Sequence, residues 1–269
     1  MQTRELDIKI DLRELENISR QARELVIDMA ATPYGCHIGG SLSVLDILIA
    51  AFAVFRNDSK HQIVLSKGHA AAALYAVLHM FGVLKENPAL RYGMARSPYT
   101  GHPGLKVPGV MFPTGSLGHG IPYALGWALA KKLSGQSGFG IAVAGDGELQ
   151  EGLCWESFQI AQAKSINNFI VIVDINGGQN DGYVCRISPQ DNLRQRFEAF
   201  GFDVIEIDGH AHDKITGALI THIQIPRRPL AVLAKTIKAK GIPGMEGRAE
   251  SHYAVIKPAK AATLKRSMS

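Results

Sequence analysis

Two apolar runs in the middle of the chain have the length and composition of strands. Residues 139–144 lead directly into Gly145-Asp146-Gly147, and residues 169–174 lead into Asn176-Gly177-Gly178. Short, nearly continuous apolar runs are typical of parallel strands that are buried on both faces. The segment from Gly152 to Ser165 between them suits a crossover helix. The pattern therefore predicts a strand–helix–strand unit.

The remainder of the chain keeps the same alternation of helix and strand. Asp11-Leu12-Arg13-Glu14 resembles a capping box, and an apolar stripe follows it at helical spacing, formed by Leu15, Ile18, Ala22, Leu25 and Met29. Further expected elements are a buried helix over 42–55, a helix over 70–81, a helix that starts at Ser188-Pro189, strands over 62–66, 203–207 and 230–234, and a proline-rich loop over 96–112.

This order predicts an α/β fold: a doubly wound, mostly parallel sheet flanked by helices. Residues 1–256 are expected to form one domain with an N-terminal helical segment, and residues 257–269 a basic C-terminal tail. The length of 269 residues is compatible with one large domain that buries a sizeable core.

Polar side chains follow both central strands at the point where each ends. A strand–helix–strand unit places Asp146 and Asn176 side by side at the carboxyl ends of neighbouring strands, where open α/β sheets bind ligands. Both offer hard oxygen ligands, and the adjacent glycines let a phosphate approach the backbone. Mg²⁺ is normally held by one or two protein oxygens together with phosphate and water. The sequence therefore predicts a clamp for a metal ion and a diphosphate.

Six blocks in register carry a family resemblance. Gly-Asp-Gly followed by this Asn looks like the thiamine-diphosphate signature, and the surrounding blocks resemble the transketolase family. The blocks begin at Cys36-His37-Ile38-Gly39-Gly40, Leu65-Ser66-Lys67-Gly68-His69, Thr100-Gly101-His102-Pro103-Gly104, Thr114-Gly115-Ser116-Leu117-Gly118, Gly145-Asp146-Gly147-Glu148 and Asp174-Ile175-Asn176-Gly177-Gly178. The resemblance covers most of residues 30–252. It implies a thiamine-diphosphate-binding fold and, within it, the diphosphate-binding domain.

The resemblance also assigns roles to residues. It implies substrate-contacting, catalytic histidines at His37, His69, His102 and His252. It implies Mg²⁺ ligation, with Ca²⁺ or Mn²⁺ able to substitute, by Asp146, Asn176 and Gly178. Binding of thiamine diphosphate is implied for His69, Gly115, Ser116, Leu117, Gly145, Asp146, Gly147, Glu148, Asn176 and Gly178. The family glutamate that matches Glu148 lies near a subunit interface.

Each of these histidines has a simpler interpretation. A single loop histidine is more often a structural hydrogen-bonding group, and only the combination with the metal motif favours function. The remaining six are interpreted as structural or surface residues, namely His61, His79, His119, His210, His212 and His222. Departures from the family pattern lie at Ile38, which replaces a proline, at His119, which replaces a glutamine, and around His252, where the usual tryptophan is missing.

The positive charge is concentrated at the end of the chain. Residues 227–269 carry an excess of eight positive charges, which leaves −3 for the rest of a chain whose formal net charge is +5. This segment is either an electropositive rim for sugar phosphates or a partner, or a solvated and partly disordered tail. The low apolar content of residues 257–269 favours the second. The basic residues are not interleaved with aromatics, so nucleic-acid binding is not expected.

Cysteine content and hydropathy bear on the compartment. Cys36, Cys154 and Cys185 are sparse and lack metal-site spacing, which is typical of a reduced, cytoplasmic protein. Residues 1–5 do not open a signal peptide, and we expect no membrane-spanning segment.

The resemblance implies one half of a split transketolase. A second subunit would carry the pyrimidine-binding domain and the catalytic glutamate that activates the cofactor, in an α₂β₂ complex. That complex would transfer a two-carbon ketol unit from a sugar-phosphate-like ketose to an aldehyde or related acceptor. Two alternatives are an α subunit of a 2-oxo-acid decarboxylase or dehydrogenase, and a non-catalytic scaffold. A dinucleotide enzyme is disfavoured because no strand leads into a Gly-x-Gly-x-x-Gly turn.

Overall fold

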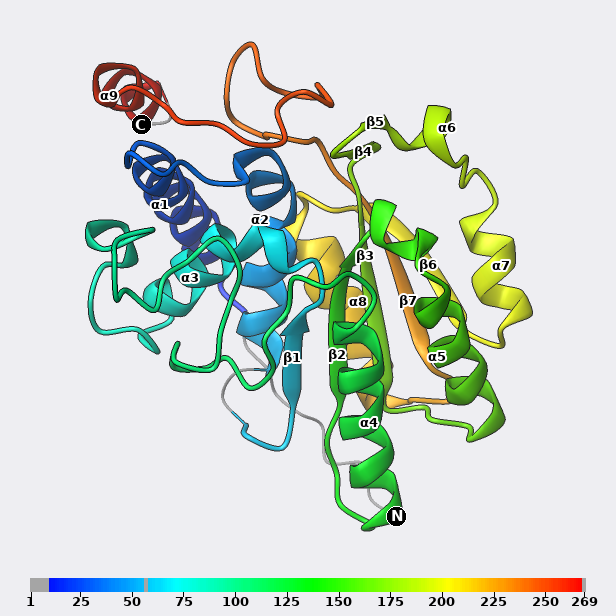
Figure 1. Cartoon of the computed structure of the whole chain (residues 1–269). Coiled ribbons are helices and arrows are strands. Elements are labelled where there is room, and N and C mark those ends of the chain that lie inside the picture. The colour runs from blue at the N-terminus through cyan, green and yellow to red at the C-terminus, as the bar shows by residue number, and fades with distance from the viewer. Residues whose placement is uncertain (1–9, 56–57, 268–269) are drawn as a thin grey trace.

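The core of the molecule is a five-stranded, all-parallel sheet. The computed structural model describes residues 10–55 and 58–267, so the expectation about residues 1–5 lies outside the described part. The strand order is β1-β2-β3-β7-β6 (Figure 1). The strands are β1 (Gln62–Leu65), β2 (Gly140–Gly145), β3 (Phe169–Ile175), β6 (Asp203–Asp208) and β7 (Leu230–Lys235). The predicted α/β fold with a parallel sheet is confirmed.

Helices cover both faces of the sheet, as a doubly wound fold requires. On one face α2 (Ile38–Phe55) and α8 (His212–Gln224) lie against the strands, with α1 (Leu12–Ala30) and α3 (Ala71–Met80) packed behind them. The other face is covered by α4 (Gly120–Leu133), α5 (Gly152–Ala163) and α7 (Leu193–Ala199). Successive strand residues alternate between the two cores: Ile141 and Val143 belong to the first, and Ala142 and Ala144 to the second.

The first helix begins and packs as the sequence predicts. The carboxylate of Asp11 accepts hydrogen bonds from the backbone N–H groups of Arg13 (3.0 Å) and Glu14 (3.3 Å). In the predicted stripe, Leu15, Ala22 and Met29 are buried, while Ile18 and Leu25 are half-buried against the same core.

The chain around Ser188 does not start a helix as expected. Val184–Ile187 form the short helix α6, and Ser188 ends it in an extended conformation, its N–H donating to the carbonyl of Val184. Ser188 is extended, which a cap before Pro189 would also be, but residues 189–190 are not helical, so no helix starts at this serine. The next helix, α7, begins at Leu193.

The expectation of a solvated C-terminal tail is wrong for most of that segment. Pro258–Arg266 form helix α9, which lies against α1 at one corner of the molecule (Figure 1). Ala261 and Leu264 are buried in the core, and the Lys265 Nζ lies 2.5 Å from the Asp28 carboxylate. Pro258 at the first helical position is a start signal that the low apolar content concealed.

Helix α2 is longer than predicted, because it begins at Ile38 rather than Leu42. Its 18 residues are long and apolar enough to pass a length-and-composition test for a membrane span. Nearly all of them are buried within the fold, however, against α1, α3 and α8, so it serves as a core helix here.

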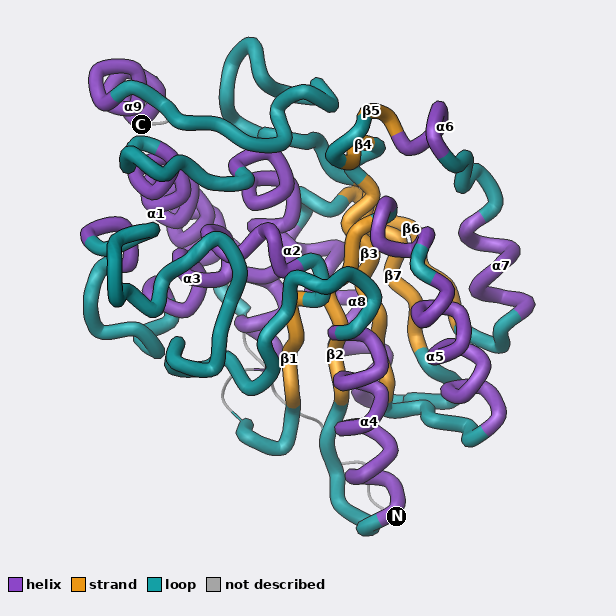
Figure 2. Tube along the Cα trace, viewed as in Figure 1, coloured by secondary structure: helices purple, strands orange, loops and turns teal. Residues whose placement is uncertain are grey.

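Loops collect at the carboxyl end of the sheet (Figure 2). The connection from β7 to α9, residues 236–257, passes the start of α2, where Cys36 and Ala254 exchange two backbone hydrogen bonds of 3.1 Å. A short hairpin, β4 (Gly178–Gln179) and β5 (Gly182–Tyr183), follows β3 on the same side. Segments distant in sequence thereby surround the strand ends.

A pair of glycine substitutions tests the packing of α4 on β2. A Cβ on Gly140 would overlap the carbonyl oxygen of Ala124, so Gly140→Ala should destabilise the chain by about 1–3 kcal/mol. Gly126, inside α4, faces open space, so Gly126→Ala should stabilise by about 0.5–1 kcal/mol. Urea denaturation measures both. Equal effects would contradict this packing.

Candidate active site at the carboxyl end of the sheet

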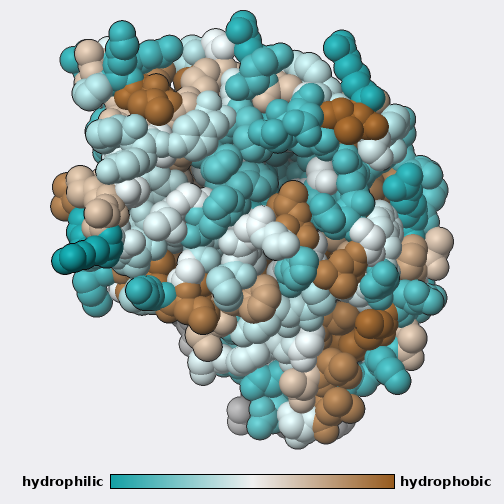
Figure 3. Space-filling model, viewed as in Figure 1, coloured by the Kyte–Doolittle hydropathy of each residue, from teal (hydrophilic) through white to brown (hydrophobic). Residues whose placement is uncertain are grey.

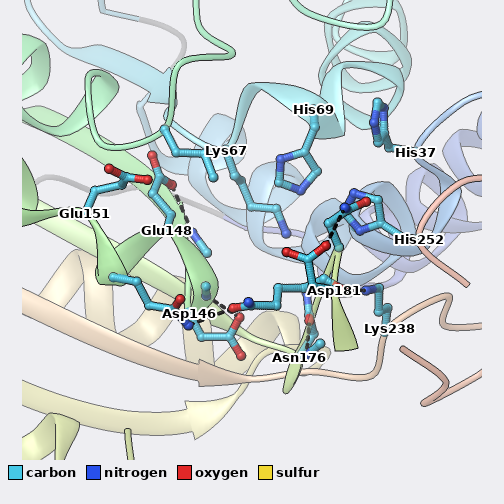
Figure 4. Close-up of a pocket in the computed structure, with 18 of the residues that line it drawn as sticks. His37, Lys67, His69, Asp146, Glu148, Glu151, Asn176, Asp181, Lys238 and His252 are labelled. Atoms are coloured by element: carbon cyan, nitrogen blue, oxygen red, sulfur yellow. Dashed lines mark hydrogen bonds between the residues drawn. The ribbon is translucent and has the colours of Figure 1, made fainter. Parts of the chain in front are cut away.

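A polar cavity of about 430 Å³ lies at the carboxyl ends of the central strands. In the space-filling view hydrophilic residues surround a hollow at this edge, whereas brown, apolar residues gather lower on this face, where α4 runs (Figure 3). Lys67 follows β1, Asp146 follows β2, Asn176 follows β3 and Lys238 lies three residues beyond β7. Because the strands are parallel, these four groups meet at one edge (Figure 4).

Asp146 occupies the position predicted from the strand pattern. Its two carboxylate oxygens accept backbone N–H groups, one from Gly147 (2.8 Å) and one from Gly177 (2.7 Å), so the ends of β2 and β3 are joined. The side chain is buried, and no lysine, arginine or histidine of the described residues lies within ion-pairing distance of it. Burial, and then the charge of Asp174, raise the pKa of Asp146 to about 6.

Asn176 and Gly178 complete the expected set of oxygen ligands. The Asn176 amide donates to the Ser43 hydroxyl (3.1 Å) and to the Asp174 carboxylate (3.3 Å), and its oxygen accepts the N–H of Gly178 (3.0 Å). This network fixes the amide so that its oxygen faces the hairpin turn.

The donor set fits a hard divalent cation. No group of three or more His, Cys, Asp or Glu side chains suitable for a metal occurs in the described part of the chain. Mg²⁺, however, needs only one or two protein carboxylate or carbonyl oxygens when a phosphate and water supply the rest. A buried carboxylate without a cationic partner is costly, and a bound cation would remove that cost. Asp146 with the oxygens of Asn176 and Gly178 therefore suits the metal.

Two buried lysines line the cavity, and the site prediction missed both. Lys67 forms a 2.6 Å ion pair with Asp174, and each side chain is at most 2% exposed. The Lys238 Nζ donates to the carbonyl of Gln179 (3.2 Å), and burial together with the charge of Lys67 lowers its pKa to about 8. Lys67 lies beside Gly68 in the same block as His69, so a cation next to a motif glycine was its local signal. Lys238 lies in the basic segment after β7 and had no such signal.

The four predicted histidines cluster together, and three of them, His37, His69 and His252, line one end of the cavity. The His37 ring centroid lies 5.6 Å from that of His69, 5.7 Å from that of His102 and 5.2 Å from that of His252. Their origins differ: His37 precedes α2, His69 lies in the 3₁₀ turn Gly68–Ala70, and the other two lie in long loops. Gly115, with φ of +148°, is needed here, because a Cβ on it would come within 2.9 Å of the His102 ring.

Three of these histidines are held neutral. Burial is the main cause in each case: it lowers the pKa of His37, lowers that of His69 well below the usual value, and lowers that of His252 to about 4. Neighbouring positive charge, from Lys67 for His69 and Lys238 for His252, acts in the same direction. The buried Nδ1 atoms of His37 and His252 have no hydrogen-bond partner within the described chain. Unpaired nitrogens beside a cavity point to a ligand.

The remaining predicted residues divide into two groups. Gly115, Leu117, Gly145 and Gly147 line the cavity. Ser116 is exposed, and neither it nor His102 is among the residues that line the cavity itself. None of the six histidines interpreted as structural or surface residues lines it either.

Glu148, whose family counterpart is expected near a subunit interface, is held by hydrogen bonds within this chain. It is buried, and its carboxylate accepts the Ser66 hydroxyl (2.5 Å) and the N–H groups of Gly118 (2.8 Å) and Gly145 (3.1 Å). Burial raises its pKa, although these hydrogen bonds oppose the shift. It therefore joins the ends of β1 and β2 to the loop before α4. Glu151, by contrast, is exposed and lines the cavity mouth.

Comparisons with known proteins agree on one family. Residues 15–269 match the family model described as transketolase, thiamine diphosphate binding domain. The chain is 38% identical to one subunit of the apulose-4-phosphate transketolase of Actinobacillus succinogenes, over 91% of this chain and 92% of that protein. It is 33% identical to the 6-deoxy-6-sulfo-D-fructose transketolase subunit SqwG of a Clostridium species, over 91% of each.

A solved structure gives the same result. The transketolase of Campylobacter jejuni superimposes with a TM-score of 0.88 at 30% identity, covering 96% of this chain. This chain spans only 43% of that transketolase chain.

Proposed function

This chain belongs to the transketolase family, and from that premise we propose that it is the diphosphate-binding subunit of a split transketolase. The observation that carries the proposal is one cavity in which a buried, unpaired carboxylate and two lysines face three clustered histidines, His37, His69 and His252. One end suits a metal ion with a diphosphate, and the other suits the hydroxyl groups of a sugar.

The metal–diphosphate end is supported by charge. Asp146, Asn176 and Gly178 would hold Mg²⁺, with Ca²⁺ or Mn²⁺ as substitutes, and the cation would compensate the buried Asp146 carboxylate. Lys67 and Lys238 would attract the diphosphate, whose negative charge would in turn stabilise the protonated form of Lys238. The glycines at 145 and 147 leave room for the phosphate oxygens.

The histidine end handles protons. When bound, thiamine diphosphate supplies the nucleophilic carbon and holds the electron pair released when a ketose carbon–carbon bond breaks. His37, His69 and His252 are neutral at pH 7, so each ring offers one donor and one acceptor nitrogen to substrate hydroxyls. The unpaired Nδ1 atoms of His37 and His252 can accept or return a proton.

A second subunit would complete the enzyme. Both similar proteins above are named as transketolase subunits, which supports a partner that carries the pyrimidine-binding domain and the catalytic glutamate, in an α₂β₂ complex in the cytoplasm. Their names specify different ketoses, so they favour the reaction class of two-carbon ketol transfer between sugar-phosphate-like molecules over any one substrate.

Reconstitution tests this function. The tagged chain should capture a partner of similar size from its source cells, identified by mass spectrometry. The reconstituted complex should transfer a ketol unit between sugar phosphates, whereas the lone chain should turn nothing over. CO₂ release from a 2-oxo acid would instead support a decarboxylase, and assembly without turnover a scaffold.

Histidine variants test the role of the cluster. His69→Asn in the reconstituted complex should lower ketol transfer by about 10²–10⁴-fold, the range for loss of acid–base assistance. His79→Asn, outside the cavity, provides the control. Unchanged transfer by the His69 variant would remove the histidines from the mechanism, because assembly alone does not require them.

A further inference from the structure

A second buried polar cluster lies outside the cavity, around one residue of α2. Its centre is Asp46, an acidic residue in an otherwise apolar helix and only 2% exposed. The carboxylate accepts hydrogen bonds from Ser19 and Arg23, and the Nδ1 of His210 lies 2.7 Å from it. Burial alone would raise the pKa of Asp46, but the His210 hydrogen bond and the Arg23 charge lower it to about 2. The cluster therefore keeps a fixed negative charge at neutral pH.

That charge fixes the orientation and tautomer of His210. Nδ1 faces a carboxylate that can only accept, so Nδ1 carries the proton. Nε2 accepts the backbone N–H of Ile237 at 2.9 Å, so it carries none. His210 thereby links the Asp46 carboxylate to the chain immediately before Lys238.

Arg23 bonds the same segment at Lys240, on the other side of Lys238. Its Nη1 donates to the carbonyl of Lys240 (3.1 Å) and to that of Leu42 (3.2 Å). The cluster therefore forms hydrogen bonds to the main chain at residues 237 and 240, on both sides of Lys238.

The segment 237–240 contains a residue with an unfavourable backbone conformation. Ala239 has φ of +57°, a left-handed conformation that is unfavourable for a non-glycine residue. It is completely buried, and its N–H donates to the carbonyl of Gly39 (3.0 Å). Such strain persists only where the surroundings enforce it. The conformation directs the Lys238 side chain into the cavity (Figure 4).

We propose that His210, oriented by Asp46, is a positioning residue that holds the segment 237–240 so that Lys238 faces the cofactor diphosphate. This inference rests on the proposed function, since it assigns Lys238 to the diphosphate. It places a determinant of cofactor affinity outside the cavity, since neither His210 nor Asp46 lines it. His210 does not touch the cofactor, so its loss should weaken cofactor binding and leave the saturated rate nearly intact.

Two substitutions of similar size separate the bonds of His210. In His210→Gln the amide reaches the place of Nε2 and can accept the Ile237 N–H, whereas in His210→Asn it reaches only the place of Nδ1, facing Asp46. We expect the Asn variant of the reconstituted complex to bind thiamine diphosphate about 10–100-fold more weakly, as for other groups that orient ligands. The Gln variant should stay close to the parent. Titration with thiamine diphosphate at fixed Mg²⁺ measures the Kd, and turnover at saturation gives kcat.

A double-mutant cycle tests whether the effect passes through Lys238. In a Lys238→Met background, His210→Asn should cause no further loss of affinity, because the side chain that it positions is absent. His212→Asn is the matched control, since His212 lies beside Asp46 without a bond to residues 237–240. It should leave the Kd unchanged.

The outcomes distinguish the two levels of inference. Equal affinities for the Gln and Asn variants, a loss confined to kcat, or an additive loss in the Lys238→Met background would overturn the positioning role. A parent complex that binds no thiamine diphosphate would overturn the proposed function, and the positioning role with it. Thermal unfolding of each variant identifies a loss that reflects misfolding.

Discussion

Asp146→Asn should abolish binding of Mg²⁺ and thiamine diphosphate without unfolding the chain. The substitution removes the charge that would hold the cation, so ketol transfer by the reconstituted complex should fall by more than about 100-fold, the upper limit for outer-shell changes around a metal. In the absence of metal, the variant should lose little folding stability. Asp146 is a buried carboxylate with a raised pKa, so removing its charge relieves a cost that offsets the one backbone N–H left without an acceptor.

Calorimetric titration and thermal unfolding with and without ligands check both halves of this expectation. The parent complex should gain thermal stability when Mg²⁺ and thiamine diphosphate are added together, and the variant should not. Asp203→Asn, at the amino-terminal start of β6 on the opposite edge of the sheet, provides a control that keeps binding. Retained turnover in the Asp146 variant would remove this residue from the metal site.

The parts of the site that local pattern could predict are those attached to strands. Asp146 and Asn176 follow buried apolar runs, and the parallel register that pairs Gly145 with Asp174 brings them together. The convergence of His37, His69, His102 and His252 could not be read from periodicity, because their loops meet only in the folded chain. That expectation depended on the family resemblance.

The errors have local physical causes. At Ser188-Pro189 one proline is compatible with both a helix start and the end of a preceding helix. In the structure α6 ends directly before Ser188, so the second case applies. At the C-terminus two apolar residues, Ala261 and Leu264, were enough to dock α9, although the segment is mostly basic.

The cluster around Asp46 shows what sequence reasoning could not reach. Ser19, Asp46 and His210 lie in three segments, and Arg23 bonds a carbonyl 217 residues away. An acid within an apolar helix was the only local signal. A buried acid in such a helix predicts that some polar group pairs with it, but not which one.

Lys67→Met should be the most destabilising single change at this edge of the sheet. Asp174 is fully buried and pairs with Lys67 at 2.6 Å, so removing the lysine leaves a charge in the protein interior without its counter-ion. Breaking a buried pair in this way costs about 3–5 kcal/mol, a large part of a typical domain stability of about 5–15 kcal/mol. Urea denaturation followed by circular dichroism measures the loss.

The second partner decides whether the cost comes from the unpaired charge. In Lys67→Met/Asp174→Asn both charges are gone. The amide oxygen at 174 can still accept the Ser43 hydroxyl, and the amide NH₂ can donate to the hydroxyl oxygen of Thr236. The double variant should therefore recover most of the stability that the lysine substitution removes. Lys60→Met breaks the half-exposed pair with Asp58 and should cost at most about 1 kcal/mol. If the double variant instead loses the sum of the two single losses, Lys67 stabilises the fold through its packing, and the charge balance between Lys67 and Asp174 is not what holds this edge of the sheet together.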